Sequence, residues 1–326
     1  MFVSSIGAAM SSFLLSVLFL LLLKEASNRW NFLAPNGVPS IGGISMGLAF
    51  FVSFLLNAPS VVNLPREIQG ILIASVVILI AGIDDDHKEL SVIQKFVVQL
   101  IAASILVGFG VRTNFVYVGD ALNVALSLLW IIGITNSINL LDVMDGLAGG
   151  TSLVIISGFC VISALGGDSL TLTLSCVLGG TIFGFWIYIV PPAKIYMGNS
   201  GSHFLGFVLA AISLTARYAT LERPVALLAP MLLLGFPILD TLFLISRRIQ
   251  KGKSAFNKSD DHIALQLLKK GYSKRKALAL MMGWTLFFVI NGLILSEAPN
   301  LFEFITVIFV GLGSFILIKK MGRVQN

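Results

Sequence analysis

Long apolar runs recur along almost the whole chain, and they limit the fold more than any other feature. We count eleven runs, at about 5–23, 40–56, 68–83, 94–111, 122–139, 149–166, 170–190, 203–216, 225–246, 277–296 and 300–318. A bilayer core requires roughly 20 apolar residues per helix, and backbone groups inside it must be paired within the segment. The runs therefore predict an all-α polytopic membrane bundle of about 11 transmembrane helices, forming a single multi-pass domain over 1–326.

The residue content agrees with this class. Hydrophobic residues make up 56% of the chain and charged residues only 12%, which excludes a water-soluble globule. Small residues such as Gly42, Gly43, Gly179 and Gly180 predict seams where helix backbones pack closely, and such seams are compatible with a homodimer. No disulfide is indicated, since both cysteines fall inside apolar runs.

The basic residues predict the orientation, because cytoplasmic loops hold the excess of lysine and arginine. With eleven spans, one side receives 18 of the 22 basic residues, including a long basic loop at 247–276. The sequence therefore predicts a cytoplasmic C-terminus and an N-terminus outside. The first run follows no basic segment and precedes no small-residue cleavage site, so we expect a retained helix.

Three consecutive aspartates, Asp84, Asp85 and Asp86, directly follow an apolar run. Carboxylates at a helix C-terminus repel the helix dipole and one another unless a cation offsets them. The cluster favours a metal-assisted reaction at a membrane face. The alternative is a solvated loop that only ends the helix.

A second polar group has a spacing of three residues: Asn136, Asn139, Asp142 and Asp145. This spacing predicts one helix face, and the cost of polar groups in lipid directs that face toward the bundle interior or a hydrated cavity. An ordinary ladder of hydrogen bonds between helices is the alternative. The predicted topology places this group, the three aspartates and several further polar residues on the cytoplasmic face, among them Lys194, Asn199 and His262.

Five blocks of residues follow one another over about 37–276. They are Val38, Pro39, Gly42 and Gly43, then Gly82, Asp84, Asp85, Lys95 and Gln99, then Asn136, Asn139, Asp142, Asp145 and Gly146, then Met197, Gly198, Asn199, Ser200, Gly201 and Ser202, and finally Pro237, Asp240, Arg247 and Arg248. Taken in this order, the blocks resemble the polyprenyl-phosphate N-acetylhexosamine-1-phosphate transferases, in particular the bacterial undecaprenyl-phosphate branch that initiates polysaccharides.

The resemblance implies transfer of a sugar 1-phosphate, by default N-acetylglucosamine 1-phosphate, from a UDP-N-acetylhexosamine to undecaprenyl phosphate. UMP is released, and cell-envelope polysaccharide synthesis begins. It also implies Mg²⁺ as cofactor, with Mn²⁺ as an alternative, and an active site on the cytoplasmic side of the bacterial inner membrane. The partners are the two substrates and the lipid bilayer, with no nucleic acid.

The same resemblance suggests a role for each matching residue. Asp84, Asp85 and Asp145 are the expected catalytic residues, and Asp84, Asp85 and Asn199 the expected metal ligands. The expected substrate-binding residues are Lys95, Asn136, Asn139, Asp142, Asp240 and His262.

Two departures from the family pattern leave other functions open. Asn199 stands where the family normally has aspartate, and His262 is all that remains of a histidine cluster. An amide oxygen can bind Mg²⁺ but lacks the formal charge of a carboxylate. One alternative is a non-catalytic relative that binds the lipid phosphate or the nucleotide sugar. A secondary transporter is the other, although the acidic groups gather at one face rather than at the span centres.

Overall fold

A computed structural model describes residues 2–30, 40–58, 63–115, 118–218, 227–254, 261–297 and 300–322. In these ranges the chain is helical and contains no strand, which confirms the predicted all-α class. The helices are α1 (Phe2–Trp30), α2 (Gly42–Asn57), α3 (Arg66–Lys88), α4 (Val92–Gly108), α5 (Asp120–Leu141), α6 (Leu147–Leu165), α7 (Ser169–Ile189), α8 (Gly198–Thr215), α9 (Ala229–Leu233), α10 (Gly235–Gln250), α11 (Ile263–Lys269), α12 (Lys274–Glu297) and α13 (Asn300–Gly322).

Six of the described helices are long and apolar enough to cross a membrane: α1, α3, α5, α6, α7 and α12. Three shorter apolar segments lie in α2, α4 and α13. The protein is therefore a multi-pass helical membrane protein. Each of the eleven predicted runs contains helix, with α9 and α10 sharing 225–246, but the count of eleven crossings stays a prediction.

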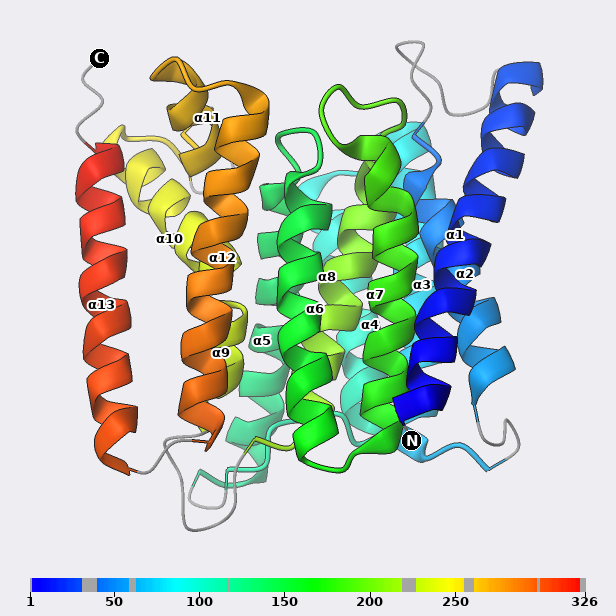
Figure 1. Cartoon of the computed structure of the whole chain (residues 1–326), viewed down its shortest axis with the longest axis horizontal. Coiled ribbons are helices and arrows are strands. Elements are labelled where there is room, and N and C mark those ends of the chain that lie inside the picture. Colours follow the sequence, from blue (N-terminus) through cyan, green and yellow to red (C-terminus); the bar gives the residue numbers. More distant parts are fainter. Residues whose placement is uncertain are drawn as a thin grey trace.

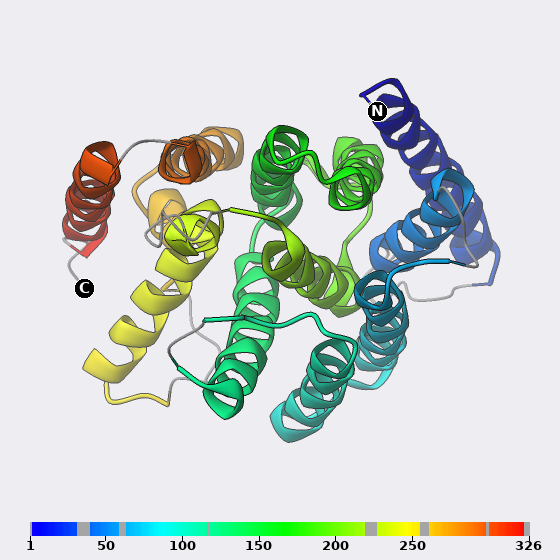
Figure 2. The ribbon, with the colours of Figure 1, turned by 90° about the horizontal axis from the view of Figure 1, so that it is seen from below.

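The helices form a bundle with α1 at one edge and α13 at the other (Figures 1 and 2). In the view of Figure 1, α1 begins at the lower end of the bundle and α13 ends at the upper end. Near the centre, α8 packs against α2, α3, α5, α6 and α7. Its side chains are buried from Ser200 to Ser213.

Although we expected 203–216 to cross the membrane, α8 is not among the described helices that are apolar enough over the required length. Its first turns carry Asn199, Ser200, Ser202 and His203, which shortens the apolar part. Because the helix is enclosed by its neighbours, these polar groups can be paired inside the protein and need not face lipid.

Two glycines bring neighbouring helices close to the start of α8. A Cβ at Gly43 of α2 would collide with the backbone of Gly201, and one at Gly82 of α3 would collide with the backbone of Ser200. The predicted packing seam at Gly43 is thereby confirmed. These contacts hold the C-terminal end of α3 against the N-terminal end of α8, where polar residues from both helices meet.

Candidate active site

The three aspartates at the end of α3 point in different directions, because successive residues of a helix are turned by about 100°. Asp84 forms an ion pair with Lys88, one turn later, with an Oδ1–Nζ distance of 3.0 Å. Its side chain is 45% exposed, which agrees with a solvated position. The structure thus separates Asp84 from the two carboxylates that follow it.

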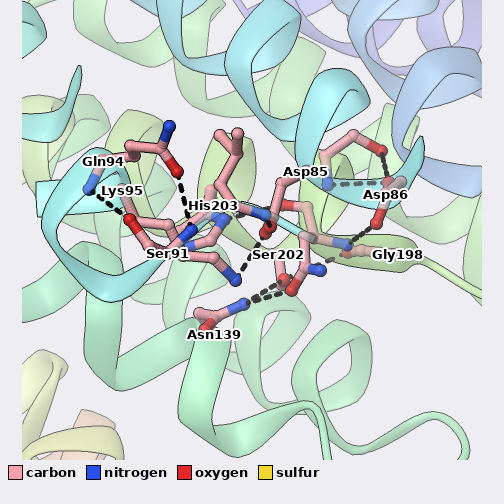
Figure 3. A network of polar contacts seen from close by, with 12 residues as sticks. Asp85, Asp86, Ser91, Gln94, Lys95, Asn139, Gly198, Ser202 and His203 are labelled. Carbon is pink, nitrogen blue, oxygen red and sulfur yellow. Dashed lines mark hydrogen bonds and ion pairs between the residues drawn. The ribbon is translucent and has the colours of Figure 1, made fainter. Parts of the chain in front are cut away.

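Asp85 is buried and faces α4. One carboxylate oxygen lies 2.7 Å from Lys95 Nζ, and the other accepts the backbone N–H of Leu90 at 2.8 Å. Ser91 and Gln94 form a capping box at the start of α4, which places Lys95 in the first turn beside α3 (Figure 3). The resemblance implies that Lys95 binds substrate and that Asp85 binds metal. In the structure these two residues form an ion pair between α4 and α3.

A cavity of only about 20 Å³ lies beside Asp85 and Lys95, and His203 also lines it. The imidazole Nδ1 contacts the carbonyl of Asn199 at 3.0 Å, whereas Nε2 is buried without a hydrogen-bond partner among the described residues. This volume fits one water molecule and no phosphate group. This cavity therefore has no room for a substrate, whereas 30% of the Lys95 side chain is exposed outside it.

Asp86 binds the N-terminal end of α8. It accepts the backbone N–H groups of Asn199 and Ser200 and, at 2.6 Å, the hydroxyl of Ser200 (Figure 3). Gly198 just before has a φ of 72°, and a Cβ there would collide with the Asp86 carboxylate. Hydrogen bonds to a charged group contribute about 1.5–3 kcal/mol each, so Asp86 fixes the position of Asn199.

The first half of the predicted polar stripe is a ladder between helices. Asn136 of α5 exchanges amide hydrogen bonds with Gln99 of α4, at 2.6 and 3.3 Å. Asn139 donates to Ser202 Oγ at 2.9 Å and to Asn199 Oδ1 at 3.3 Å. Both asparagines thus link α5 to its neighbours, and Asn139 adjoins the residues that Asp86 positions.

The second half of the stripe departs from the prediction of one continuous helix face. Because α5 ends at Leu141 and Gly146 has a φ of 77°, Asp142 and Asp145 lie in a turn between α5 and α6. Asp145 lies 3.2 Å from Lys274 Nζ and accepts the backbone N–H of Ala193 at 3.4 Å. The spacing of three residues continues in the sequence to Asp145, but the helix ends at Leu141. The spacing therefore predicted a longer helix than the structure has.

A cavity of about 470 Å³ opens beside this turn, and we call it the acidic cavity. The carboxylate of Asp142 makes no hydrogen bond or ion pair with the described residues. Burial raises its pKa, and the nearby Asp86 and Asp145 carboxylates raise it further, to about 7. An uncompensated carboxylate favours a cation here. The cavity is lined by Ser40, Asp86, Asp142, Val143, Met144, Asp145, Ile189, Tyr196, Met197, Gly198 and Asn199.

The described residues contain no group of three or more His, Cys, Asp or Glu side chains that could hold a metal by itself. Mg²⁺, however, is usually bound by one or two carboxylates together with substrate phosphates and water. The oxygen atoms of Asp142, Asp145 and Asn199 along the acidic cavity fit that manner of binding. Asp84 and Asp85, the other predicted metal ligands, do not line this cavity.

A second cavity, of about 670 Å³, shares Val143 with the acidic cavity. We call it the basic cavity. Arg248 in its wall is almost fully buried, and the negative charge of Asp261 acts on its guanidinium. Lys251 is paired with Asp261, at 2.6 Å. The cavity is lined by Asn139, Leu140, Val143, Arg248, Lys251, Lys253, Asp261, His262, Leu265 and Lys269.

His262 in this wall is oriented by Asp240 of α10. The buried carboxylate of Asp240 accepts from His262 Nδ1 at 3.0 Å and from the backbone N–H of Ile263 at 3.0 Å. It therefore caps α11 as well as fixing the imidazole ring. Asp240 itself does not line the basic cavity, and its expected contact with the substrate stays a prediction.

Several residues of the site were not singled out by sequence. The basic loop was predicted only as a group, so Lys251, Lys253 and Lys269 gave no separate signal, and neither did the contact of Lys274 with Asp145. Their sequence separations reveal nothing about which side chains converge. Val38 and Pro39 of the early motif, and 255–260 of the basic loop, lie outside the described residues.

Comparison with known proteins gives a consistent result. Residues 68–217 match the model of glycosyl transferase family 4. A probable undecaprenyl-phosphate N-acetylglucosaminyl 1-phosphate transferase of Bacillus subtilis is 33% identical, over 84% of this chain and 78% of that protein. A decaprenyl-phosphate N-acetylglucosaminephosphotransferase of Mycobacterium leprae is 34% identical, over 76% and 70%. A phospho-N-acetylmuramoyl-pentapeptide-transferase of Lactobacillus gasseri is 29% identical, over 82% and 91%.

Proposed function

The chain belongs to glycosyl transferase family 4, and on that basis we propose that it transfers N-acetylglucosamine 1-phosphate from its UDP-sugar to undecaprenyl phosphate. A phosphate oxygen of the lipid attacks the phosphorus next to the sugar, the bond from that phosphorus to the bridging oxygen breaks, and UMP leaves. The names of the Bacillus and Mycobacterium relatives support the sugar and the class of acceptor. The product would start a cell-envelope polysaccharide.

Two adjacent cavities of opposite charge are the observation that carries this proposal. Two substrates that each bear phosphate groups repel one another, and the protein must offset that repulsion. The basic cavity supplies cationic side chains, and the acidic cavity supplies carboxylates that can share a cation with the substrates. Because Val143 lines both, the two cavities adjoin, and the proposal places the diphosphate at their boundary.

We assign the UDP-sugar to the basic cavity. Arg248, Lys253 and Lys269 offer cationic donors to a diphosphate, and His262 is held in a fixed orientation by Asp240. Asn139 at the boundary has an amide that can meet the nucleotide or the sugar. The volume of about 670 Å³ is within the range of pockets that hold small organic ligands.

Asp142, Asp145 and Asn199 would hold Mg²⁺, or Mn²⁺ in its place, at the acidic cavity. A bound divalent cation neutralises the diphosphate and stabilises the charge that develops on the leaving UMP. Asp86 keeps Asn199 directed at its partners through its contacts with the start of α8. Lys274 holds Asp145 in place.

The lipid phosphate would approach at the end of α3. Asp85 fixes Lys95, whose side chain remains 30% exposed and can meet a phosphate at the bundle surface. Asp84 is the exposed carboxylate of the three and is therefore the candidate to accept a proton from the lipid phosphate. The excess of basic residues supports placing this end of the bundle in the cytoplasm, with eleven spans and the N-terminus outside, in a bacterial inner membrane.

A second function keeps the two binding sites but lacks turnover. It is favoured by Asn199, which provides no formal charge for a cation, and by His262 standing without the other histidines of the family pattern. Such a protein would bind the nucleotide sugar or the lipid phosphate without releasing UMP.

Release of UMP tests these functions. We would combine the purified protein in detergent with undecaprenyl phosphate, UDP-N-acetylglucosamine and Mg²⁺, and compare Asp142→Asn and Asn199→Asp with the native chain. We expect Mg²⁺-dependent UMP release, a loss on the order of 100-fold in Asp142→Asn, and equal or higher release in Asn199→Asp. Asp168→Asn is a matched control, because that carboxylate only caps α7 through Thr171.

Each outcome separates the hypotheses. Release only in Asn199→Asp would establish the non-catalytic relative. If no variant releases UMP but UDP-N-acetylglucosamine still binds, the proposed transferase activity is wrong and the proposed donor site stands. If no variant releases UMP and none binds UDP-N-acetylglucosamine, both proposals are wrong.

A further inference from the structure

Another cavity lies between α11, α12 and α13 and is not used by the proposed reaction. Its volume is about 290 Å³, and it shares no lining residue with the acidic or the basic cavity. Leu267, Met281 and Leu317 form an apolar floor, each with at most 3% of its surface exposed. We call this cavity the lipid groove.

The mouth of the groove is basic and aromatic. Lys270 and Lys276 line it together with Tyr272, and the Lys276 ammonium lies 5.0 Å from the centre of the tyrosine ring. Both lysines are exposed. They lie at and just before the start of α12, at the end of the bundle where that helix leaves the membrane. Tyrosine and lysine at this level are typical of the boundary between lipid and water.

The rest of the groove is apolar and open to the bilayer. Trp284 lies eight residues beyond Lys276 on α12, which is about 12 Å along the helix axis. Leu280 and Ile316 at the rim are 38% and 61% exposed. The groove therefore changes from cationic to apolar along the direction of the membrane normal, over a distance comparable to a lipid headgroup and the first part of its chain.

We propose that the lipid groove binds an anionic glycerophospholipid of the surrounding membrane. Its phosphate lies between Lys270 and Lys276, and one acyl chain lies along Trp284. Basic pockets between transmembrane helices are sites where anionic headgroups bind, since the cations and the apolar wall complement the two parts of the lipid. This inference depends on the membrane fold and is independent of the proposed transfer reaction.

The polyprenyl phosphate substrate does not fit this place. Leu265 and Lys269 of α11 line the basic cavity, whereas Leu267 and the following Lys270 line the lipid groove. The helix therefore separates a phosphate in the groove from the diphosphate it would have to attack. A bound phospholipid would instead support α11, and with it one wall of the basic cavity.

Native mass spectrometry of the full chain tests the proposal. The delipidated protein in detergent would be titrated with phosphatidylglycerol and with phosphatidylcholine of identical acyl chains. We expect tighter retention of phosphatidylglycerol, lowered roughly tenfold or more in the double variant Lys270→Gln, Lys276→Gln. The double variant Lys24→Gln, Arg29→Gln removes two basic residues from the end of α1 and should retain phosphatidylglycerol like the native chain.

A second variant keeps the charges and blocks the groove. Leu280→Trp places a larger side chain at the rim, so it should also weaken phosphatidylglycerol retention. Equal retention of the two lipids, or loss in the α1 variant equal to that in the groove variant, would overturn the proposal. Displacement of phosphatidylglycerol by equimolar undecaprenyl phosphate would also overturn it, because the groove would then belong to the substrate.

Discussion

Asp142 differs from the other carboxylates of the site because it has no partner among the described residues. Asp84 is paired with Lys88, Asp85 with Lys95, and Asp145 with Lys274. A carboxyl group that is buried beside other carboxylates holds its proton more firmly. Ionising Asp142 in the folded protein therefore costs free energy, and this cost makes the stability depend on pH.

We expect stability without divalent cations to fall as the pH rises from about 4 to about 7. The pKa of Asp142 is raised from 3.8 to about 7 in the folded protein, so the unfolded chain releases this proton first. Over that window the folded state binds more protons, and raising the pH favours unfolding. Thermal unfolding in detergent with EDTA should show a decrease of a few degrees that is much smaller in Asp142→Asn.

The control is Asp168→Asn, which should keep the native pH dependence because Asp168 belongs to the opposite end of α6 and α7. Adding Mg²⁺ at the higher pH should restore stability in the native chain more than in Asp142→Asn. Equal slopes in the native chain and in Asp142→Asn would show that another group titrates.

For individual residues, the sequence predicted which side chains belong to the site better than it predicted their contacts. Asp85 and Lys95 were expected in one site, and they lie 2.7 Å apart. The sequence could not assign separate directions to the three aspartates, because that depends on the rotation of α3 against α4 and α8. The cap that Asp86 provides for α8 depends on a contact across 113 residues, which no local spacing reveals.

Among the elements, α11 is a short helix that forms one wall of the basic cavity. It has seven residues, too few for an isolated helix to be stable in water. The Asp240 carboxylate holds its first turn through Ile263 and the preceding His262. The wall of the basic cavity that α11 forms thus depends on one buried side chain of α10.

We expect Asp240→Ala to loosen α11 locally. Losing a charged cap that is buried removes about 1–3 kcal/mol, so amide hydrogen exchange of 263–269 should accelerate on the order of tenfold or more. Exchange in α3 and α8 should stay unchanged, and the KM for the UDP-sugar should rise. Asp120→Asn breaks only the exposed ion pair with Arg112 and serves as the matched control. Unchanged exchange of α11 would mean that Asp240 does not hold it.

The helical elements themselves were largely predictable, since apolar runs and helices coincide. Two elements were not. The stripe that ends at Asp145 leaves the helix after Leu141, where Asp142 is the C-cap of α5, and the positive φ of Gly146 comes only at the start of α6. The helix α8 was expected as a span, yet its polar start is enclosed by neighbouring helices, which is a property of the whole packing.

For the whole molecule, the orientation in the membrane is the prediction with the widest consequences. We expect Arg217→Cys, after α8, to react with an impermeant maleimide in intact cells, and Lys253→Cys to react only after permeabilisation. Both are made in a Cys160→Ala, Cys176→Ala background. The uneven distribution of basic residues predicts that Lys253 lies inside and Arg217 outside. The reverse labelling would place the two cavities outside, where no UDP-sugar is expected.

The contact of Asp86 with the start of α8 also has a consequence for how the chain is made. The carboxylate and the N–H group of Asn199 are 113 residues apart, so during translation the end of α3 leaves the ribosome well before its partner. At synthesis rates of about 5–20 residues per second, that interval is roughly 6–23 seconds. Throughout it, the acidic end of α3 lacks its partner on α8, and a chain that stalls before Gly198 never acquires it. Proteases that degrade incomplete membrane proteins therefore have a defined period in which to recognise the unpaired acidic end of α3.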